Sequence, residues 1–155
     1  MMLSLGGKKM RSSLARWVTL AAVFTLSCGD ATGIDIADLV GTWNASKLEF
    51  TSAANATLKA DVVGLGGSLS ITFSSNGSFT LTEREPGELA NTRTGTFLLK
   101  GDTLTISESG QGSPTDVLIS LSGSALTLTN DDDEYDFNND GTEEPARLIV
   151  VLNKQ

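Results

Sequence analysis

Apolar residues occupy alternate positions along most of the chain after residue 68. Leu69, Ile71 and Phe73 alternate with serine and threonine, and Phe79 and Leu81 continue the same two-residue period. A period of two places successive side chains on opposite faces of an extended strand. The pattern therefore predicts a series of half-buried β-strands. Further strands are expected at 42–51, 92–100, 104–106, 117–121, 126–128 and 147–152.

Short turn signals separate these strands. Asn76-Gly77 is a strong hairpin signal, and Gly101-Asp102 and the triplet at 122–124 also favour tight turns. Eight or nine strands joined in this way most simply close into an all-β, up-and-down antiparallel barrel, because closure removes exposed sheet edges. A two-sheet β-sandwich is the alternative, since periodicity alone does not distinguish the two.

The segment before the first strand predicts one short helical turn. Residues 35–40 carry Asp35 as a candidate N-cap, and Gly41 ends the turn. The folded domain is therefore expected to span 35–155. Residues 52–67 are the least regular part of this span, with a G-L-G-G stretch that is typical of a linker.

The first 27 residues predict an export signal. Lys8, Lys9, Arg11 and Arg16 precede an apolar run at 17–26. Ten residues are too few for a membrane-spanning helix, which takes about 20. A basic segment followed by a short apolar run is instead typical of a cleaved signal peptide.

Cys28 follows this run directly and is the only cysteine of the chain. The sequence L-S-C-G at 26–29 resembles a lipobox, although Thr25 stands where leucine is commoner. We therefore expect residues 1–27 to be removed, Cys28 to carry a covalent lipid, and residues 28–34 to act as a tether. An unlipidated signal peptide is the alternative. Gly29, in place of the aspartate typical of inner-membrane retention, favours an exported protein anchored to the outer membrane.

Composition removes several classes of function. The chain has no histidine and one cysteine, so it cannot build a Ser-His-Asp or Cys-His catalytic pair or a zinc site of His and Cys ligands. Its net charge of −8 argues against nucleic acid as a partner. Carboxylate-only catalysis stays formally open. Glu83, Glu85 and Glu88 are its nearest candidates, but a charged loop explains them, and we predict a non-enzymatic protein.

The motif Gly41-Thr42-Trp43 introduces a resemblance. A helical turn, then G-x-W at the start of a β-meander, resembles the lipocalins and the bacterial lipocalin-like lipoproteins, and the segment 95–106 is similar to a hairpin of those domains. The resemblance implies a lipocalin-like barrel in which Trp43 seals the closed end under a basic side chain. Lys154 is favoured for that side chain in an eight-stranded barrel, with Arg147 as the alternative.

An acidic segment at 130–144 predicts a metal site. Eight of its fifteen residues are acidic, and it contains D-x-N-x-D-G at 136–141. Oxygens at every second position of a turning loop can converge on Ca²⁺, which takes six to eight oxygen ligands. The segment is not an EF-hand, because Arg147 occupies the twelfth position. A solvated acidic turn is the alternative. The candidate ligands are Asp136, Asn138, Asp140, Thr142 and Glu144.

Two functions follow from these features. The first is an envelope lipoprotein whose barrel binds a small hydrophobic molecule. The second is a calcium-stabilised surface scaffold that binds a protein or a glycan through its loops. The residues expected to line a ligand cavity are Leu69, Ile71, Phe73, Phe79, Leu81, Phe97, Leu104 and Ile106.

Overall fold

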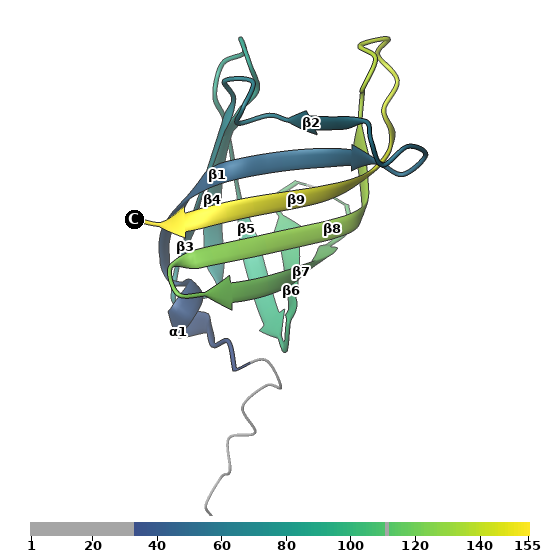
Figure 1. Ribbon diagram of the computed structural model, residues 1–155. Helices are drawn as coiled ribbons and strands as arrows, with labels where there is room; N and C mark the ends of the chain where they lie inside the picture. The colour runs from purple at the N-terminus through teal and green to yellow at the C-terminus, as the bar shows by residue number, and fades with distance from the viewer. Residues whose placement is uncertain (1–32, 111) are drawn as a thin grey trace, which may run out of the picture.

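The computed structural model describes residues 33–110 and 112–155. The expected signal peptide and Cys28 lie outside these residues. The described chain forms one short helix and nine strands (Figure 1). These are α1 (Ile36–Leu39), β1 (Gly41–Ser52), β2 (Lys59–Asp61), β3 (Ser68–Phe73), β4 (Ser78–Arg84), β5 (Asn91–Lys100), β6 (Thr103–Glu108), β7 (Thr115–Ser122), β8 (Ala125–Tyr135) and β9 (Glu144–Lys154).

Eight of the nine strands close into an antiparallel barrel, which confirms the predicted lipocalin-like fold. The strands from β3 to β9 pair in chain order, and β1 joins β3 to β9. Trp43 of β1 lies opposite Ile71 of β3 on one edge and opposite Lys154 of β9 on the other. A single sheet that closes on itself in this way is a barrel and not a sandwich of two sheets.

The ninth strand, β2, lies outside the closed ring. It pairs with the second half of β1, beyond the stretch of β1 that pairs with β3. The Asp61 carboxylate accepts a hydrogen bond from the Leu48 amide at 3.2 Å, and the Val62 amide donates to the Leu48 carbonyl at 2.8 Å. The segment around β2 therefore satisfies backbone groups of β1 that have no partner in β3.

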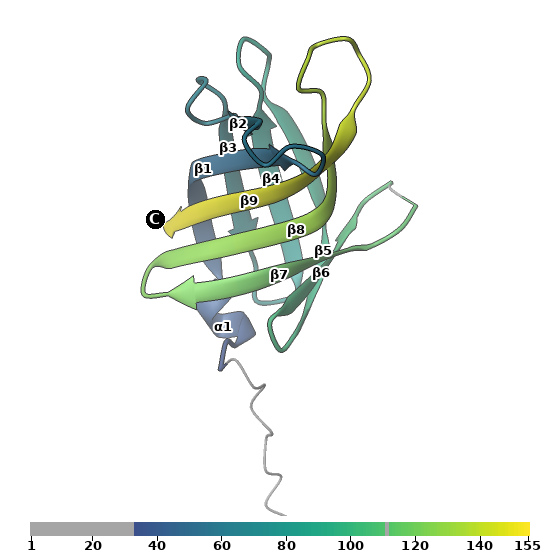
Figure 2. The ribbon, with the colours of Figure 1, turned by 45° about the vertical axis from the view of Figure 1, so that its right-hand side comes forward.

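Helix α1 lies at one end of the barrel (Figure 2). The Asp35 amide donates to the Asp38 carboxylate at 2.9 Å, which stabilises the first turn. Leu39 is fully buried, and Ile34 is also buried although the tether prediction included it. We call this end the closed end. No helix within the described residues has the length and apolarity needed to cross a lipid bilayer.

The core fills the half of the barrel next to α1. Phe73 and Phe97 pack edge to face with 4.9 Å between ring centroids, and both are buried. Leu104, Leu126 and Leu152 are fully buried around them. All five alternate with outward-facing neighbours, as the two-residue period predicted.

The acidic segment forms a shorter loop than its sequence predicted. Strand β8 continues to Tyr135 and β9 begins at Glu144, so only residues 136–143 form the connection. A register shift between Asn130 and Asp133 accommodates the aspartates. The treatment of all of 130–144 as loop was therefore wrong. Pairing with β9 and stacking of Tyr135 on Phe50, at 4.6 Å between centroids, outweigh the low strand preference of aspartate.

Candidate functional site

Trp43 and Lys154 form the seal of the closed end. The fully buried Trp43 donates from Nε1 to the Leu39 carbonyl at 2.7 Å. Lys154 Nζ lies 5.1 Å from the centroid of the Trp43 ring and donates to the Asp38 carbonyl at 2.9 Å. A cation at this distance from an indole is attracted by the ring. Lys154, and not Arg147, thus lies over Trp43.

Arg147 has a different neighbour. Its Nε lies 2.9 Å from Asp131 Oδ1, and both side chains are exposed.

The first residue of the G-x-W motif also has a clear role at the seal. Gly41 has φ of +128°, and a Cβ built on it would lie 3.1 Å from Lys154 Cε. Glycine therefore allows both this backbone conformation and the lysine stem beside it.

The barrel contains a cavity of about 530 Å³ in the half away from α1. All eight strands of the ring contribute residues to its lining, and most of these strands contribute apolar ones. Leu69, Ile71 and Leu81 line one side, and Leu128 and Val150 line the other. We call this the inner cavity. Small-molecule sites are typically clefts or cavities of about 300–1,000 Å³ with mainly apolar walls.

The eight residues predicted to line a cavity divide into two groups. Leu69, Ile71, Leu81 and Ile106 border the inner cavity. The other four are buried in the core of the closed half and do not border it. They are Phe73, Phe79, Phe97 and Leu104. The three phenylalanines therefore lie on the closed-end side of the inner cavity, while the four aliphatic residues line it.

A group of three charged side chains lies in the wall of the inner cavity. Arg93 of β5 donates from Nη1 to Glu108 of β6 at 3.1 Å, and its Nη2 lies 2.5 Å from Glu83 of β4. All three side chains are between about one fifth and one third exposed. Arg93 Nε is buried and has no hydrogen-bond partner within the described chain.

This ion-pair group was not predicted from the sequence. Glu83 was expected in a charged loop, and neither Arg93 nor Glu108 was a candidate. The two-residue period could have indicated these inward positions. Arg93 and Phe97 are four residues apart on β5 and therefore share one face. Likewise Glu83 follows Leu81 on the inward face of β4, and Glu108 follows Ile106 on β6. The inward positions are thus apolar near the closed end and charged near the other end.

A second cavity of about 320 Å³ adjoins the first. Both are lined by Leu48, Phe50 and Glu83, so the two cavities meet at these residues. We call the second one the outer cavity. Its carboxylate-bearing lining residues are Glu83, Glu85, Glu134, Asp136 and Glu143.

Aromatic rings also lie at this junction. Tyr135 lines the outer cavity and stacks on Phe50. Phe137 packs edge to face on Tyr135, with 5.0 Å between the ring centroids. Aromatic and acidic groups therefore lie together where the linings of the two cavities meet.

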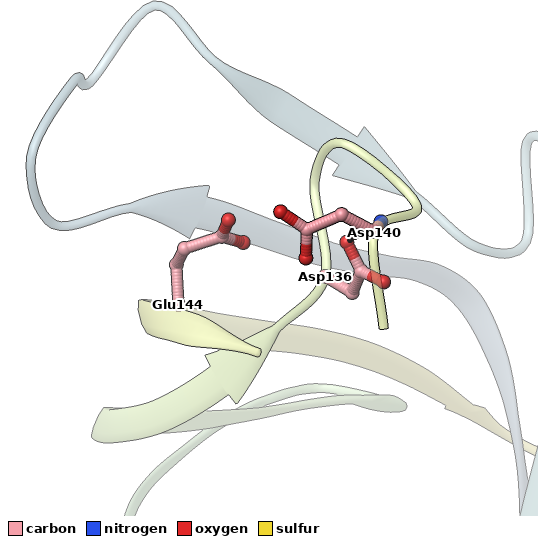
Figure 3. A group of neighbouring side chains, drawn as sticks. All are labelled: Asp136, Asp140 and Glu144. Atoms are coloured by element: carbon pink, nitrogen blue, oxygen red, sulfur yellow. Dashed lines mark hydrogen bonds between the residues drawn. The ribbon is translucent and has the colours of Figure 1, made fainter. Parts of the chain in front are cut away.

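The predicted metal ligands lie in the loop between β8 and β9 and, for Glu144, at the first residue of β9, at the end of the barrel opposite α1. Asp136, Asp140 and Glu144 each offer one carboxylate oxygen, and these atoms lie within 4.8 Å of one another. Figure 3 shows the three carboxylates gathered at the base of the loop. Carboxylates at this separation are suited to share one hard cation such as Ca²⁺.

The loop also uses these carboxylates for its own hydrogen bonds. Asp136 accepts from the amides of Asn138, Asp140 and Gly141 at 2.8–3.2 Å. The Asn138 side-chain amide donates to Glu144 at 3.1 Å. These contacts stabilise the observed conformation of the loop.

Thr142, within the same loop, forms a hydrogen bond to Asp140. Its amide donates to Asp140 Oδ1 at 2.8 Å. This backbone hydrogen bond, followed by those from the side chains of Thr142 and Asn138, lowers the pKa of Asp140 below its usual value of 3.8. Asp140 therefore stays ionised, as a metal ligand must.

The model of the lipocalin-like domain family matches residues 39–128. This segment begins at the end of α1, contains the G-x-W motif and extends into β8. It includes Arg93 and most of the wall of the inner cavity. No curated protein matches the chain.

Proposed function

Because the chain belongs to the lipocalin-like domain family, we propose that its barrel is a non-enzymatic binding site for a small, mainly apolar molecule. The observation that supports this most directly is the inner cavity of about 530 Å³. The closed end is sealed by Trp43 and Lys154, so the ligand would enter from the end that carries the loop between β8 and β9. Burial of its apolar surface would supply most of the affinity.

Titration with a neutral fluorescent probe, N-phenyl-1-naphthylamine, tests this proposal. We expect saturable binding with a blue shift of the emission. Ile106→Phe and Ile106→Trp place extra volume in the inner cavity and should weaken or abolish binding. Leu98→Trp is the matched control, because Leu98 is 63% exposed on the outer face of the neighbouring strand. Absence of saturable binding, or equal binding by the Ile106 and Leu98 variants, would refute the proposal.

We further propose that the protein is an exported lipoprotein held on the outer membrane by lipid on Cys28. Only five residues, 29–33, separate Cys28 from Ile34, and a chain of this length reaches roughly 17 Å when fully extended. Ile34 and α1 lie at the closed end, so the anchor would hold that end near the membrane and the cavity away from it. More than one acyl chain would make attachment stable.

Metabolic labelling with a radioactive fatty acid tests the anchor. The label should enter the wild-type protein and be absent from Cys28→Ser, which should also leave the membrane fraction. Ser27→Ala, which keeps a small residue before the cysteine, is the control. A labelled Cys28→Ser protein, or a wild-type protein without label, would refute lipidation at this residue.

A calcium-stabilised scaffold is the second candidate function, in which the loops bind a protein or a glycan. The convergence of Asp136, Asp140 and Glu144 favours it. Calorimetric titration with Ca²⁺ should show saturable heat that is lost in Asp136→Ala and Asp140→Ala and kept in Asp116→Asn, which lies on β7 outside the loop. No heat and no rise in Tm at millimolar Ca²⁺ would refute the metal site.

A further inference from the structure

The charges around the two cavities point to one class of ligand. We infer that the ligand is an organic cation, an ammonium group on an apolar body. This inference rests on the proposed binding function and adds that the ligand is positively charged. Among the described residues, eight carboxylates and one guanidinium line the two cavities together. The carboxylates belong to Glu83, Glu85, Glu108, Asp132, Asp133, Glu134, Asp136 and Glu143.

The single cation of the lining does not offer a site for an anion. Arg93 is held by Glu83 on one side and by Glu108 on the other. Its Nε is buried in the wall, so this nitrogen does not face the cavity. An anionic ligand such as a fatty acid would have to displace one glutamate, which would then lie unpaired beside it. Like charges at such distances repel, so the ion-pair group disfavours a carboxylate ligand.

The outer cavity has the opposite character, because it attracts positive charge. Its described lining contains five carboxylates and no lysine or arginine. A cleft lined by one sign of charge concentrates ions of the other sign and speeds their association. A cation would therefore be drawn to this side of the barrel before its apolar part reaches the inner cavity.

The junction of the two cavities fits an ammonium group in particular. Phe50 borders both cavities, and Tyr135 stacks on it in the outer one. Aromatic faces attract alkylammonium groups, which also carry apolar surface. With the ammonium group between Phe50 and Glu83, a short alkyl chain would extend into the inner cavity towards Ile71 and Leu81.

Three probes with the same ten-carbon chain test the inference. Decyltrimethylammonium, decanol and decanoate are titrated as competitors of N-phenyl-1-naphthylamine. Calcium is left out of the buffer, because Asp136 lines the outer cavity and is also a candidate calcium ligand. We expect the cation to bind about tenfold tighter than the alcohol, with decanoate weakest. Added salt should weaken the cation and leave the alcohol unchanged.

The outcomes separate the two proposals. Failure of all three probes, and of the neutral fluorophore, would overturn the binding function itself. Binding of decanol as tight as that of the cation, or tighter binding of decanoate, would overturn only the inferred charge of the ligand.

Matched variants test whether the carboxylates of the outer cavity cause the preference for the cation. Glu85→Gln combined with Glu143→Gln removes two exposed charges of the outer cavity and leaves Arg93 with both partners. This double variant should weaken the cation severalfold and not the alcohol. Asp102→Asn, in the turn between β5 and β6, is the charge control and should change neither. Equal loss of cation binding in the Asp102 variant would show that only net charge matters and would overturn the site.

A second double variant should reverse the preference for the cation over the carboxylate. Glu83→Gln combined with Glu108→Gln frees the Arg93 guanidinium, so decanoate should now bind tighter than decyltrimethylammonium. Circular dichroism and Tm establish that this variant is folded. If it does not fold, the outer-cavity pair decides the question alone, since those two side chains are exposed.

Discussion

The ring of Phe79 lies directly over Gly95 of the neighbouring strand. A Cβ built on Gly95 would lie 2.7 Å from Phe79 Cε1 and would also collide with the Ser107 carbonyl. The glycine on β5 thus makes room for a buried phenylalanine on β4. The same glycine lies between Phe97 and Arg93 on the inward face, where the interior changes from apolar to charged.

Gly95→Ala should therefore destabilise the barrel. Inserting one methyl group into a packed interior costs about 1–3 kcal/mol, and here backbone also has to move. Urea unfolding would measure the loss. Gly112→Ala is the control, because a Cβ at Gly112 meets nothing within 4 Å. Equal stability of the two variants would contradict the described packing.

Loss of the lysine at the closed end should also destabilise the fold. Lys154→Met keeps most of the stem but removes the charge over Trp43 and the donor to the Asp38 carbonyl. We expect a loss of about 1–2 kcal/mol in the free energy of unfolding. Lys100→Met, at an exposed position before the turn between β5 and β6, should change it by less than about 0.5 kcal/mol. A Lys154 variant as stable as wild type would mean that the lysine is not part of the seal.

Truncation of leucines should have unequal effects in the two halves of the barrel. Leu104→Ala leaves a void in the core of the closed half and should cost about 3–5 kcal/mol. Leu81→Ala only enlarges the inner cavity, since Leu81 already borders open space and is not fully buried. Its cost should be clearly smaller. Denaturant unfolding of both variants gives the comparison, and equal costs would argue that the inner cavity is filled.

The Glu49 carboxylate should contribute to the free energy of unfolding at neutral pH and contribute less at acidic pH. Hydrogen bonds from Lys47 and then Lys59 lower the pKa of Glu49 below its usual value of 4.5. A lowered pKa stabilises the folded state at pH values above the unfolded pKa, and this contribution is lost as the pH falls through the folded pKa. Glu49→Gln should thus be less stable than wild type at pH 7, by up to about 1 kcal/mol.

The difference between Glu49→Gln and wild type should shrink when the pH drops below about 4.5. Unfolding by urea at pH 7 and at pH 3 measures it. Glu88→Gln, at an exposed position in the loop between β4 and β5, serves as the control for the loss of one surface carboxylate. A Glu49 deficit that is as large at pH 3 as at pH 7 would mean that the loss comes from packing and not from charge.

The alternating pattern was sufficient to predict the antiparallel strands, because each strand has one apolar face. Short turns favoured closure into a barrel, but the period itself left a two-sheet sandwich open. The resemblance of the G-x-W motif to the lipocalins added the seal. An eight-stranded ring brings the end of the last strand beside the start of the first, and for this reason Lys154 could be matched with Trp43 from sequence alone.

The charged half of the interior could not be predicted in the same way. The two-residue period puts Arg93, Glu83 and Glu108 on inward faces, but a charge inside a barrel is costly unless it is paired, so the period alone did not justify placing them there. The pairing joins three different strands and only the register of β4, β5 and β6 brings it about. The extension of β8 through the aspartates likewise depends on pairing with β9, which no local preference indicates.

The closure of the ring between β1 and β9 has a consequence for how the chain folds. Ala45 at the start of the domain pairs with Leu152, so the contact that completes the barrel is one of the most distant in sequence. Such long-range contacts fold slowly, because a large loop must be closed before they form. Until β9 has been synthesised, β1 and β8 each keep an unpaired edge and the Trp43 indole lacks its lysine. Folding of this domain is therefore expected to follow synthesis and not to accompany it.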